Sequence, residues 1–180
     1  MDDKAILLRD KLNQIIVLTE ESESLLGEGG PSLIKFVLKP IFDFDPSIIA
    51  VKWNQFTPYF NDGDPCVFSV NWEGSLKIEG VDEDAGDYED GFISPWFFSY
   101  YLKKDETVPE LGLDTEYWTQ EKVDELLEIT KEIGFDLCKS PYNPKFNGKY
   151  QIVLERIYGD GVEVVHYRDG TVEVNEYEHD

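Results

Sequence analysis

The carboxyl-terminal stretch Val162-Glu-Val-Val-His-Tyr-Arg-Asp-Gly-Thr-Val-Glu-Val-Asn-Glu-Tyr177 predicts the fold class most clearly. Two valine-rich runs flank Asp169-Gly170, a dipeptide typical of a two-residue hairpin turn. With that turn, Tyr167 faces Val172 and Val165 faces Val174 on one side of the hairpin, and His166 meets Glu173 on the other. One side is apolar and the other polar, which is the pattern of a half-buried antiparallel sheet.

Two helices are expected outside this sheet. Residues 3–26 carry apolar residues at helical spacing, and Gly27 with the following Gly29-Gly30-Pro31 predicts that this helix ends there as a flexible joint. Residues 119–133 form the second helix, with Thr119 as its cap and Gly134 just beyond its end. The helices and the sheet together predict a single α+β domain.

Short runs of branched and aromatic residues predict the remaining strands. Glu73-Gly74-Ser75 separates two of them and is expected to form a hairpin loop. A β-meander is expected to close the chain. The predicted strands are 34–38, 48–53, 66–70, 76–78, 150–158, 162–167 and 171–177.

The charge of the chain excludes several classes of function. Sixteen basic and thirty-eight acidic residues give the 180-residue chain a net charge of -22, which opposes direct binding to nucleic acids or anionic membranes. The acidic start Met1-Asp2-Asp3-Lys4 is unlike a secretory signal, and no apolar run is long enough to span a bilayer, so a cytoplasmic protein is expected. Cys66 and Cys138 lack the spacing of a zinc or redox site and are expected to be buried thiols, with a disulfide between them as the alternative.

The negative charge is concentrated in the middle of the chain. Residues 41–100 hold twelve acidic and two basic residues, and the loop at 82–91 alone holds six acidic residues. Such a surface attracts basic partners and can present carboxylates where a nucleic acid presents phosphates. Tyr100, in the aromatic stretch after the loop, is expected to act as an anchor inside the charged rim. The predicted partner-binding residues are Asp82, Glu83, Asp84, Asp87, Glu89, Asp90 and Tyr100.

The catalytic signals are weak. His166 and His179 are the two imidazoles, and neither belongs to a nucleophile, metal or cofactor motif, so no catalytic residue, metal or cofactor is predicted. The alternative is a small metal-dependent hydrolase that uses carboxylates of the turn at 61–66, together with His166, beside a pocket lined by aromatic residues. The residues of this alternative site are Trp53, Tyr59, Asn61, Asp62 and Asp64.

Two segments carry a family resemblance: Trp53-Asn-Gln-Phe-Thr-Pro-Tyr-Phe-Asn-Asp-Gly-Asp-Pro-Cys-Val-Phe-Ser-Val70 and the ending Val164 to Asp180 with its Arg-Asp-Gly turn and acidic tail. Over about a fifth of the chain, they resemble a family of uncharacterised acidic proteins met in phage and bacterial genomes. The resemblance implies a phage or bacterial cytoplasm and transfers no activity. With the charge, it predicts a non-enzymatic acidic binding protein, a phage-related inhibitor that acts as a DNA mimic on a basic host or defence protein.

Overall fold

A computed structural model gives the fold of part of the chain. It describes residues 3–59, 66–71, 76–81, 91–94, 99–100, 102, 112–114, 116–133 and 148–178, and the structural statements below concern these residues. The described helices are α1 (Asp3–Phe44), α3 (Gln120–Glu132) and α4 (Gly148–Tyr158). The described strands are β1 (Ile48–Phe56), β2 (Ser69–Asn71), β3 (Leu76–Ile78), β4 (Phe92–Ile93), β5 (Val162–Tyr167) and β6 (Val172–Glu176).

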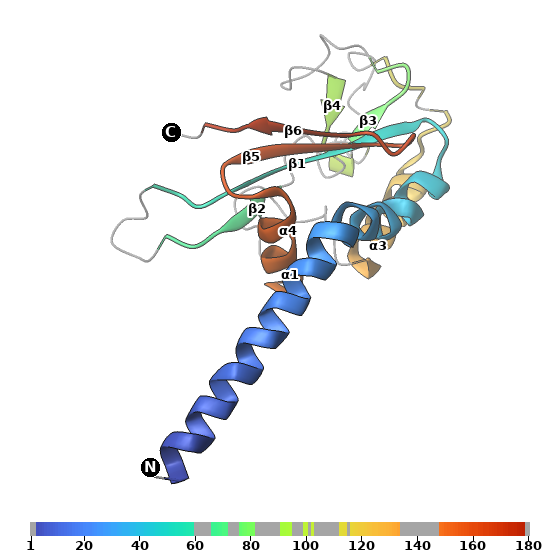
Figure 1. The fold of residues 1–180 in the computed structure, drawn as a ribbon. Helices are drawn as coiled ribbons and strands as arrows, with labels where there is room; N and C mark the ends of the chain where they lie inside the picture. Colours follow the sequence, from blue (N-terminus) through green and yellow to red (C-terminus); the bar gives the residue numbers. More distant parts are fainter. Residues whose placement is uncertain are drawn as a thin grey trace.

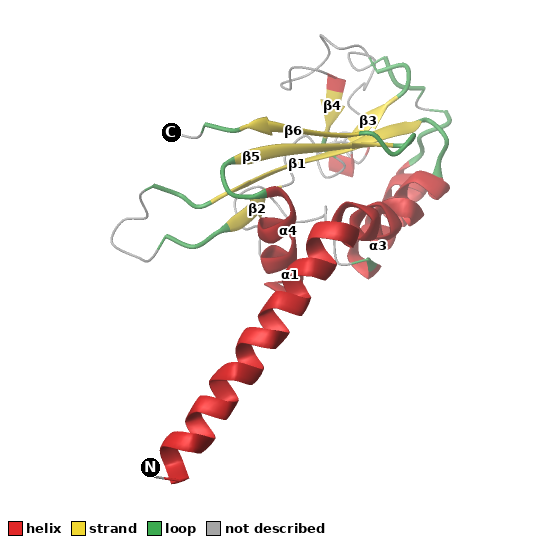
Figure 2. Ribbon diagram, in the orientation of Figure 1, coloured by secondary structure: helices red, strands yellow, loops and turns green. Residues whose placement is uncertain are grey.

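The described strands form one six-stranded antiparallel sheet in the order β4-β3-β1-β5-β6, with β2 also paired to β1. β1 lies at its centre, paired with β5 along one edge and with β3 and then β2 along the other. Helices α3, α4 and the carboxyl-terminal half of α1 gather on the same side of the sheet (Figures 1 and 2). The fold is therefore α+β, as the sequence predicted.

The core fills the space between the sheet and these helices. Trp53 of β1 lies at its centre, fully buried, among residues from β3, β5 and all three helices. Gln55, two residues further along β1, is also buried; it accepts from Trp53 Nε1 at 3.0 Å and donates to the carbonyl of Leu154 at 3.1 Å. Because a buried amide needs partners, these bonds tie α4 to the centre of the sheet.

The predicted end of the first helix near Gly27 is wrong. α1 continues through the glycines and Pro31 to Phe44, and the predicted strand at 34–38 is part of this helix. The buried residues Ile34, Leu38 and Ile41 follow helical spacing, whereas the strand was predicted from the branched and aromatic residues of the run. Gly30 has a packing role, because a Cβ there would lie 2.7 Å from Cγ1 of Ile157, so its small size lets α1 and α4 approach closely.

The predicted strand at 150–158 is also wrong, since these residues form α4. Leu154 is fully buried, and Ile157 and Tyr158 pack against the same core. Spacings of three and four residues place these side chains on one face of a helix, whereas a strand would send neighbours to opposite faces. Tertiary packing therefore overrides the strand preference of the branched and aromatic residues.

The carboxyl-terminal hairpin is confirmed, but its predicted register is off by one residue. Tyr167 N–H donates to the carbonyl of Thr171 at 2.9 Å, so Arg168 belongs to a three-residue turn that ends at Gly170 with φ 95°. His166 therefore pairs with Val172 rather than with Glu173, and it faces the core. Arg168 lies in this turn, and its guanidinium donates to the carbonyl groups of Ile48 and Phe42, bonds that favour the longer turn.

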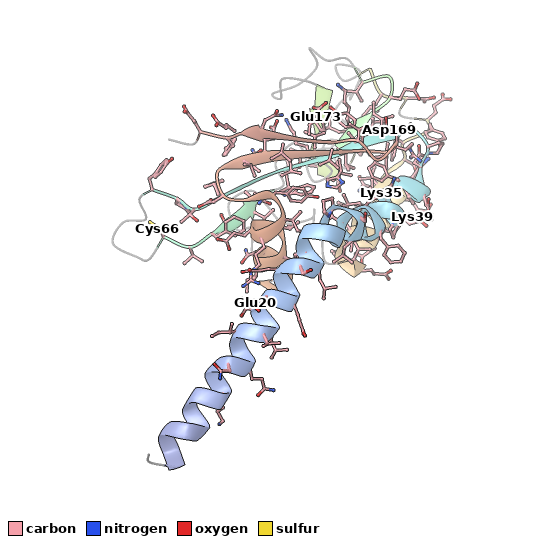
Figure 3. All side chains as sticks on the ribbon, in the orientation of Figure 1. Glu20, Lys35, Lys39, Cys66, Asp169 and Glu173 are labelled. Atoms are coloured by element: carbon pink, nitrogen blue, oxygen red, sulfur yellow. The ribbon has the colours of Figure 1, made fainter. Side chains whose placement is uncertain are left out.

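The middle strands differ from prediction in their pairing. β2 and β3 do not pair as a hairpin with each other, because both pair with β1, at Asn54–Phe56 and Ile48–Val51 respectively. Cys66 is exposed, so the expectation of a buried thiol there is wrong, and Cys138 lies outside the described residues. Figure 3 shows Cys66 away from the helices, a few residues before β2.

Candidate functional site

The residues predicted to bind a partner are only partly described. Asp82, Glu83, Asp84, Asp87, Glu89 and Asp90 lie outside the described residues. Tyr100 is described and is 41% exposed, whereas Ile93 of the same aromatic stretch is buried. Tyr100 is thus accessible, as an anchor residue must be.

Hydrogen bonds place Tyr100 beside the start of α3. Gln120 of α3 donates through Nε2 to Ser99 Oγ at 3.0 Å, and Ser99 Oγ lies 3.5 Å from a carboxylate oxygen of Asp124. Ser99 directly precedes Tyr100, so the aromatic residue is held next to the first turns of α3.

The outer side of α3 carries a row of carboxylates that we call the α3 acidic face. Its members are exposed and follow the helix at intervals of three and four residues: Glu121, Asp124, Glu125, Glu128 and Glu132. The row is about 16 Å long, given a rise of about 1.5 Å per residue. Lys131 neutralises part of this charge through an ion pair with Glu128 at 2.5 Å. The face still presents a concentrated negative charge on one rigid element.

α3 is anchored by its opposite side and by an ion pair. Val123, Leu126 and Leu127 are buried in the core, and Thr119 caps the helix by accepting from the N–H of Lys122. Lys122 Nζ lies 2.5 Å from Oδ2 of Asp45, the residue that follows α1. This pair removes Lys122 as a competing positive charge and fixes the α3 acidic face relative to α1.

The electrostatics of that pair favour its charged form. Burial by itself would raise the pKa of Asp45, but the bonds from Lys122, Ser47 and Tyr117 outweigh it and lower the pKa to about 2. Burial likewise opposes the charged form of Lys122, and its contacts with Asp45 and Tyr117 reverse this and raise the pKa of Lys122. The Lys122 ammonium also lies 3.4 Å from the centre of the Tyr117 ring, a cation–π contact.

The alternative site is described only at Trp53 and Tyr59. Tyr59 is 84% exposed, whereas Trp53 is fully buried and stacks on His166 with 5.4 Å between ring centres. Trp53 is thus a core residue rather than part of an open pocket, and Asn61, Asp62 and Asp64 lie outside the described residues. Among the residues that the structure describes, no group of three or more His, Cys, Asp or Glu side chains could hold a metal ion.

His166 is enclosed in the core. Its Nε2 lies 2.5 Å from the hydroxyl of Tyr158, and burial lowers the pKa of His166 to about 4. Burial also raises the pKa of Tyr158. The pair is therefore neutral at pH 7, with the environment of a satisfied core histidine rather than that of an accessible general base.

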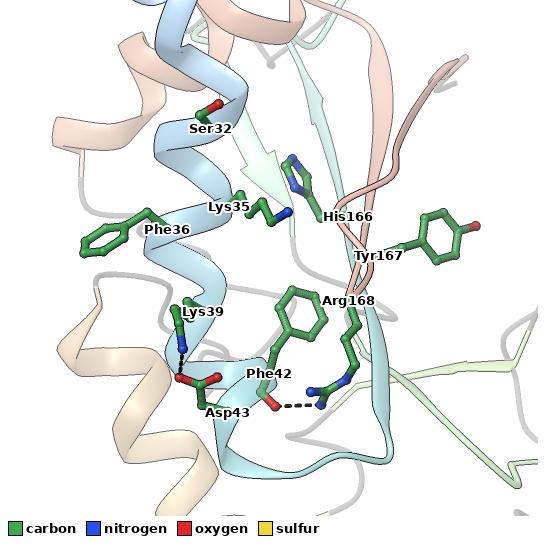
Figure 4. A pocket seen from close by; sticks show the side chains of 9 residues that line it. All are labelled: Ser32, Lys35, Phe36, Lys39, Phe42, Asp43, His166, Tyr167 and Arg168. Atoms are coloured by element: carbon green, nitrogen blue, oxygen red, sulfur yellow. Dashed lines mark hydrogen bonds and ion pairs between the residues drawn. The ribbon is translucent and has the colours of Figure 1, made fainter.

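A pocket of about 410 Å³ opens between α1 and the β5–β6 hairpin (Figure 4). Its positive side chains already have partners: Lys39 pairs with Asp43, and Arg168 donates to backbone carbonyls. Lys35 lies near Asp169, whose pKa is lowered by hydrogen bonds from Thr171 and to a smaller extent by the charge of Lys35. These contacts hold α1 against the β5–β6 hairpin, so the residues around the pocket have a structural role. It is lined by Ser32, Lys35, Phe36, Lys39, Phe42, Asp43, His166, Tyr167 and Arg168.

The α3 acidic face was not among the residues predicted to bind a partner. Its signal was present in the sequence, since Glu121, Glu125, Glu128 and Glu132 repeat with helical spacing opposite the apolar positions. The segment 82–91 holds six acidic residues within ten, so the density of charge along the sequence favours that segment over α3.

No described helix is long and apolar enough to cross a membrane. No protein-family model, curated protein or solved structure matches this chain.

Proposed function

We propose that this chain is a non-enzymatic binding protein that uses the α3 acidic face, with Tyr100 beside it, to engage a basic protein surface. The observation that carries the proposal is the row of exposed carboxylates on one anchored helix in a chain of net charge -22. We extend the same role to the acidic residues at 82–91, whose charge adds to the attraction.

The physical basis is the match between a carboxylate row and a site built for phosphates. Side chains three or four residues apart on a helix lie about 5–6 Å apart at their Cβ atoms, so the face offers closely spaced negative charges along a line. A groove rich in Lys and Arg that binds nucleic acid attracts such a line through the same Coulomb force. The partner is therefore a nucleic-acid-binding protein, and the chain inhibits it by occupying its nucleic-acid site.

An aromatic residue next to the charges gives the interface more than electrostatic attraction. Tyr100 is exposed beside the first turns of α3 and offers apolar area that supports a short-range contact. We place the encounter in a phage or bacterial cytoplasm, following the resemblance of the segments 53–70 and 164–180. The hydrolase alternative gains no support from Trp53 and His166, which are both core residues.

The direct test captures the partner and then competes for it. The immobilised chain is exposed to a bacterial lysate, and the bound proteins are eluted with double-stranded DNA or with rising salt. The proposal predicts a basic nucleic-acid-binding protein that DNA releases and that binds less tightly as the Debye length shrinks from about 10 Å at 0.1 M to about 3 Å at 1 M salt. Recovery of no basic protein, or of one that neither DNA nor salt releases, contradicts it.

A further inference from the structure

The amino-terminal part of α1 projects from the other described helices and strands. We call residues 3–28 the arm; it extends beyond the other described elements, as Figures 1 and 2 show. Its length is about 39 Å. Ile16, Val17 and Leu18 are each about half exposed, and Leu25 is 74% exposed. A single helix in water is only marginally stable, and exposed apolar side chains cost free energy in water, so a second helix packed along the arm would stabilise it.

The charges of the arm are complementary about its midpoint, Ile16. The three basic residues, Lys4, Arg9 and Lys11, lie twelve, seven and five residues before Ile16. Glu28, Glu23 and Glu21 lie twelve, seven and five residues after it. The remaining acidic residues of the arm, Asp3, Asp10 and Glu20, fall at the same level as Gly29, Ser22 and Leu12 when the helix is reversed about Ile16. A reversed copy therefore brings every basic residue level with an acidic one and places no like charges opposite each other.

We propose that the arm pairs antiparallel with the arm of a second copy of this chain, about a two-fold axis at Ile16. A parallel pair in register is disfavoured, because it places the glutamate-rich halves of the two arms side by side and keeps them away from the basic residues, which all precede Ile16. In the antiparallel pair, the two domains lie at opposite ends of the helix pair, so they do not clash with each other.

The residue pattern also provides a seam for such a pair. Small or apolar residues recur at alternating intervals of three and four, at positions 5, 8, 12, 15, 19, 22 and 26. Positions 9, 16 and 23 are spaced by seven, so they form one row on the helix beside this seam. In the antiparallel pair, position 9 of each chain therefore lies level with position 23 of the other, on either side of the two copies of position 16, and this register sets arginine against glutamate.

The test is a charge exchange in the full chain. Sedimentation velocity over a concentration series, up to about 100 µM, measures the dimer dissociation constant; a dimer with a Kd of about 10 µM is largely assembled there. Arg9→Glu and Glu23→Arg are each expected to weaken the dimer by at least about tenfold, since each places two pairs of like charges at the interface. The double variant restores opposite charges and is expected to return to within about threefold of the original constant.

Circular dichroism controls for loss of the helix, and Glu20→Arg, which faces an uncharged position in the pair, is the matched control. Three outcomes overturn the proposal. The first is that the unaltered chain is monomeric throughout the series. The second is that the single exchanges leave the dimer dissociation constant unchanged, as expected for a parallel pair or for a dimer through another surface. The third is that the double variant forms a weaker dimer than either single variant.

Discussion

Asp45 and Lys122 form a nearly buried ion pair, with 2.5 Å between Oδ2 and Nζ, that joins the end of α1 to the first turn of α3. Tyr117 donates to the same carboxylate at 2.7 Å, and Ser47 donates to its other oxygen. The pair fixes the helix that carries the α3 acidic face, so the proposed binding surface depends on a contact with a residue far away in the sequence.

We therefore expect Asp45→Asn to destabilise the fold by about 3 kcal/mol, because removing one partner leaves the Lys122 charge uncompensated in a largely buried place. Asp43→Asn is the matched control. It breaks the exposed pair with Lys39 and should cost less than about 1 kcal/mol. Urea unfolding at pH 7 measures both, and equal losses would contradict the structural role of Asp45.

Two neighbouring glycines of α1 should respond to alanine with opposite signs. Gly30→Ala places a Cβ 2.7 Å from Cγ1 of Ile157, so α4 must shift, and we expect a loss of about 1 to 2 kcal/mol. A Cβ on Gly29 would meet nothing within 4 Å from elsewhere in the described part of the chain, and Gly29→Ala should stabilise the helix by up to about 1 kcal/mol. Thermal melts of the two variants check the close approach of α1 and α4; stabilisation by both substitutions would argue against it.

Stability should fall in mild acid because of His166. Burial lowers the pKa of His166 from 6.5 to about 4, so between these pH values the unfolded chain binds a proton at His166 and the folded chain does not. The contribution of the neutral His166 to the free energy of unfolding is therefore fully present above pH 6.5. It is lost as the pH falls toward 4, by about 3 kcal/mol in all.

The measurement compares unfolding free energies from pH 7.5 to 4.5 in two backgrounds. Tyr158→Phe keeps the imidazole, whereas Tyr158→Phe/His166→Phe removes it, so the difference in pH slope isolates His166 from the many surface carboxylates. Parallel slopes would mean that His166 takes up its proton equally well in both states.

The sequence predicted those parts of the fold whose signals are local. The cap at Thr119 with the buried row of Val123, Leu126 and Leu127 predicted α3, and the run after Gly161 predicted both strands of the final hairpin. The predicted register of this hairpin was wrong because the turn includes Arg168. The guanidinium of Arg168 donates to carbonyls at the end of α1 and the start of β1, which are distant in the sequence.

The failures share a physical cause. Gly29, Gly30 and Pro31 weaken a helix by themselves, and α1 persists through them because its later turns are buried and because Gly30 admits Ile157. Local propensity cannot report such a distant contact. The candidate site shows the same limit: the spacing of its carboxylates is visible in the sequence, but the placement of Tyr100 beside them depends on the bonds that join Ser99 to Gln120 and Asp124.

The most direct measurement is the association rate of the chain with its basic partner when equal charge is removed from two different surfaces. The triple variant Glu121→Gln/Glu125→Gln/Glu132→Gln neutralises the α3 acidic face, and Glu173→Gln/Glu176→Gln/Glu178→Gln makes the same change in net charge on exposed residues at the end of the chain. We predict that the first slows association at least about tenfold at low salt, with the difference shrinking as salt rises, and that the second slows it less than about twofold. Equal effects of the two variants would show that net charge alone attracts the partner and would contradict a binding surface on α3.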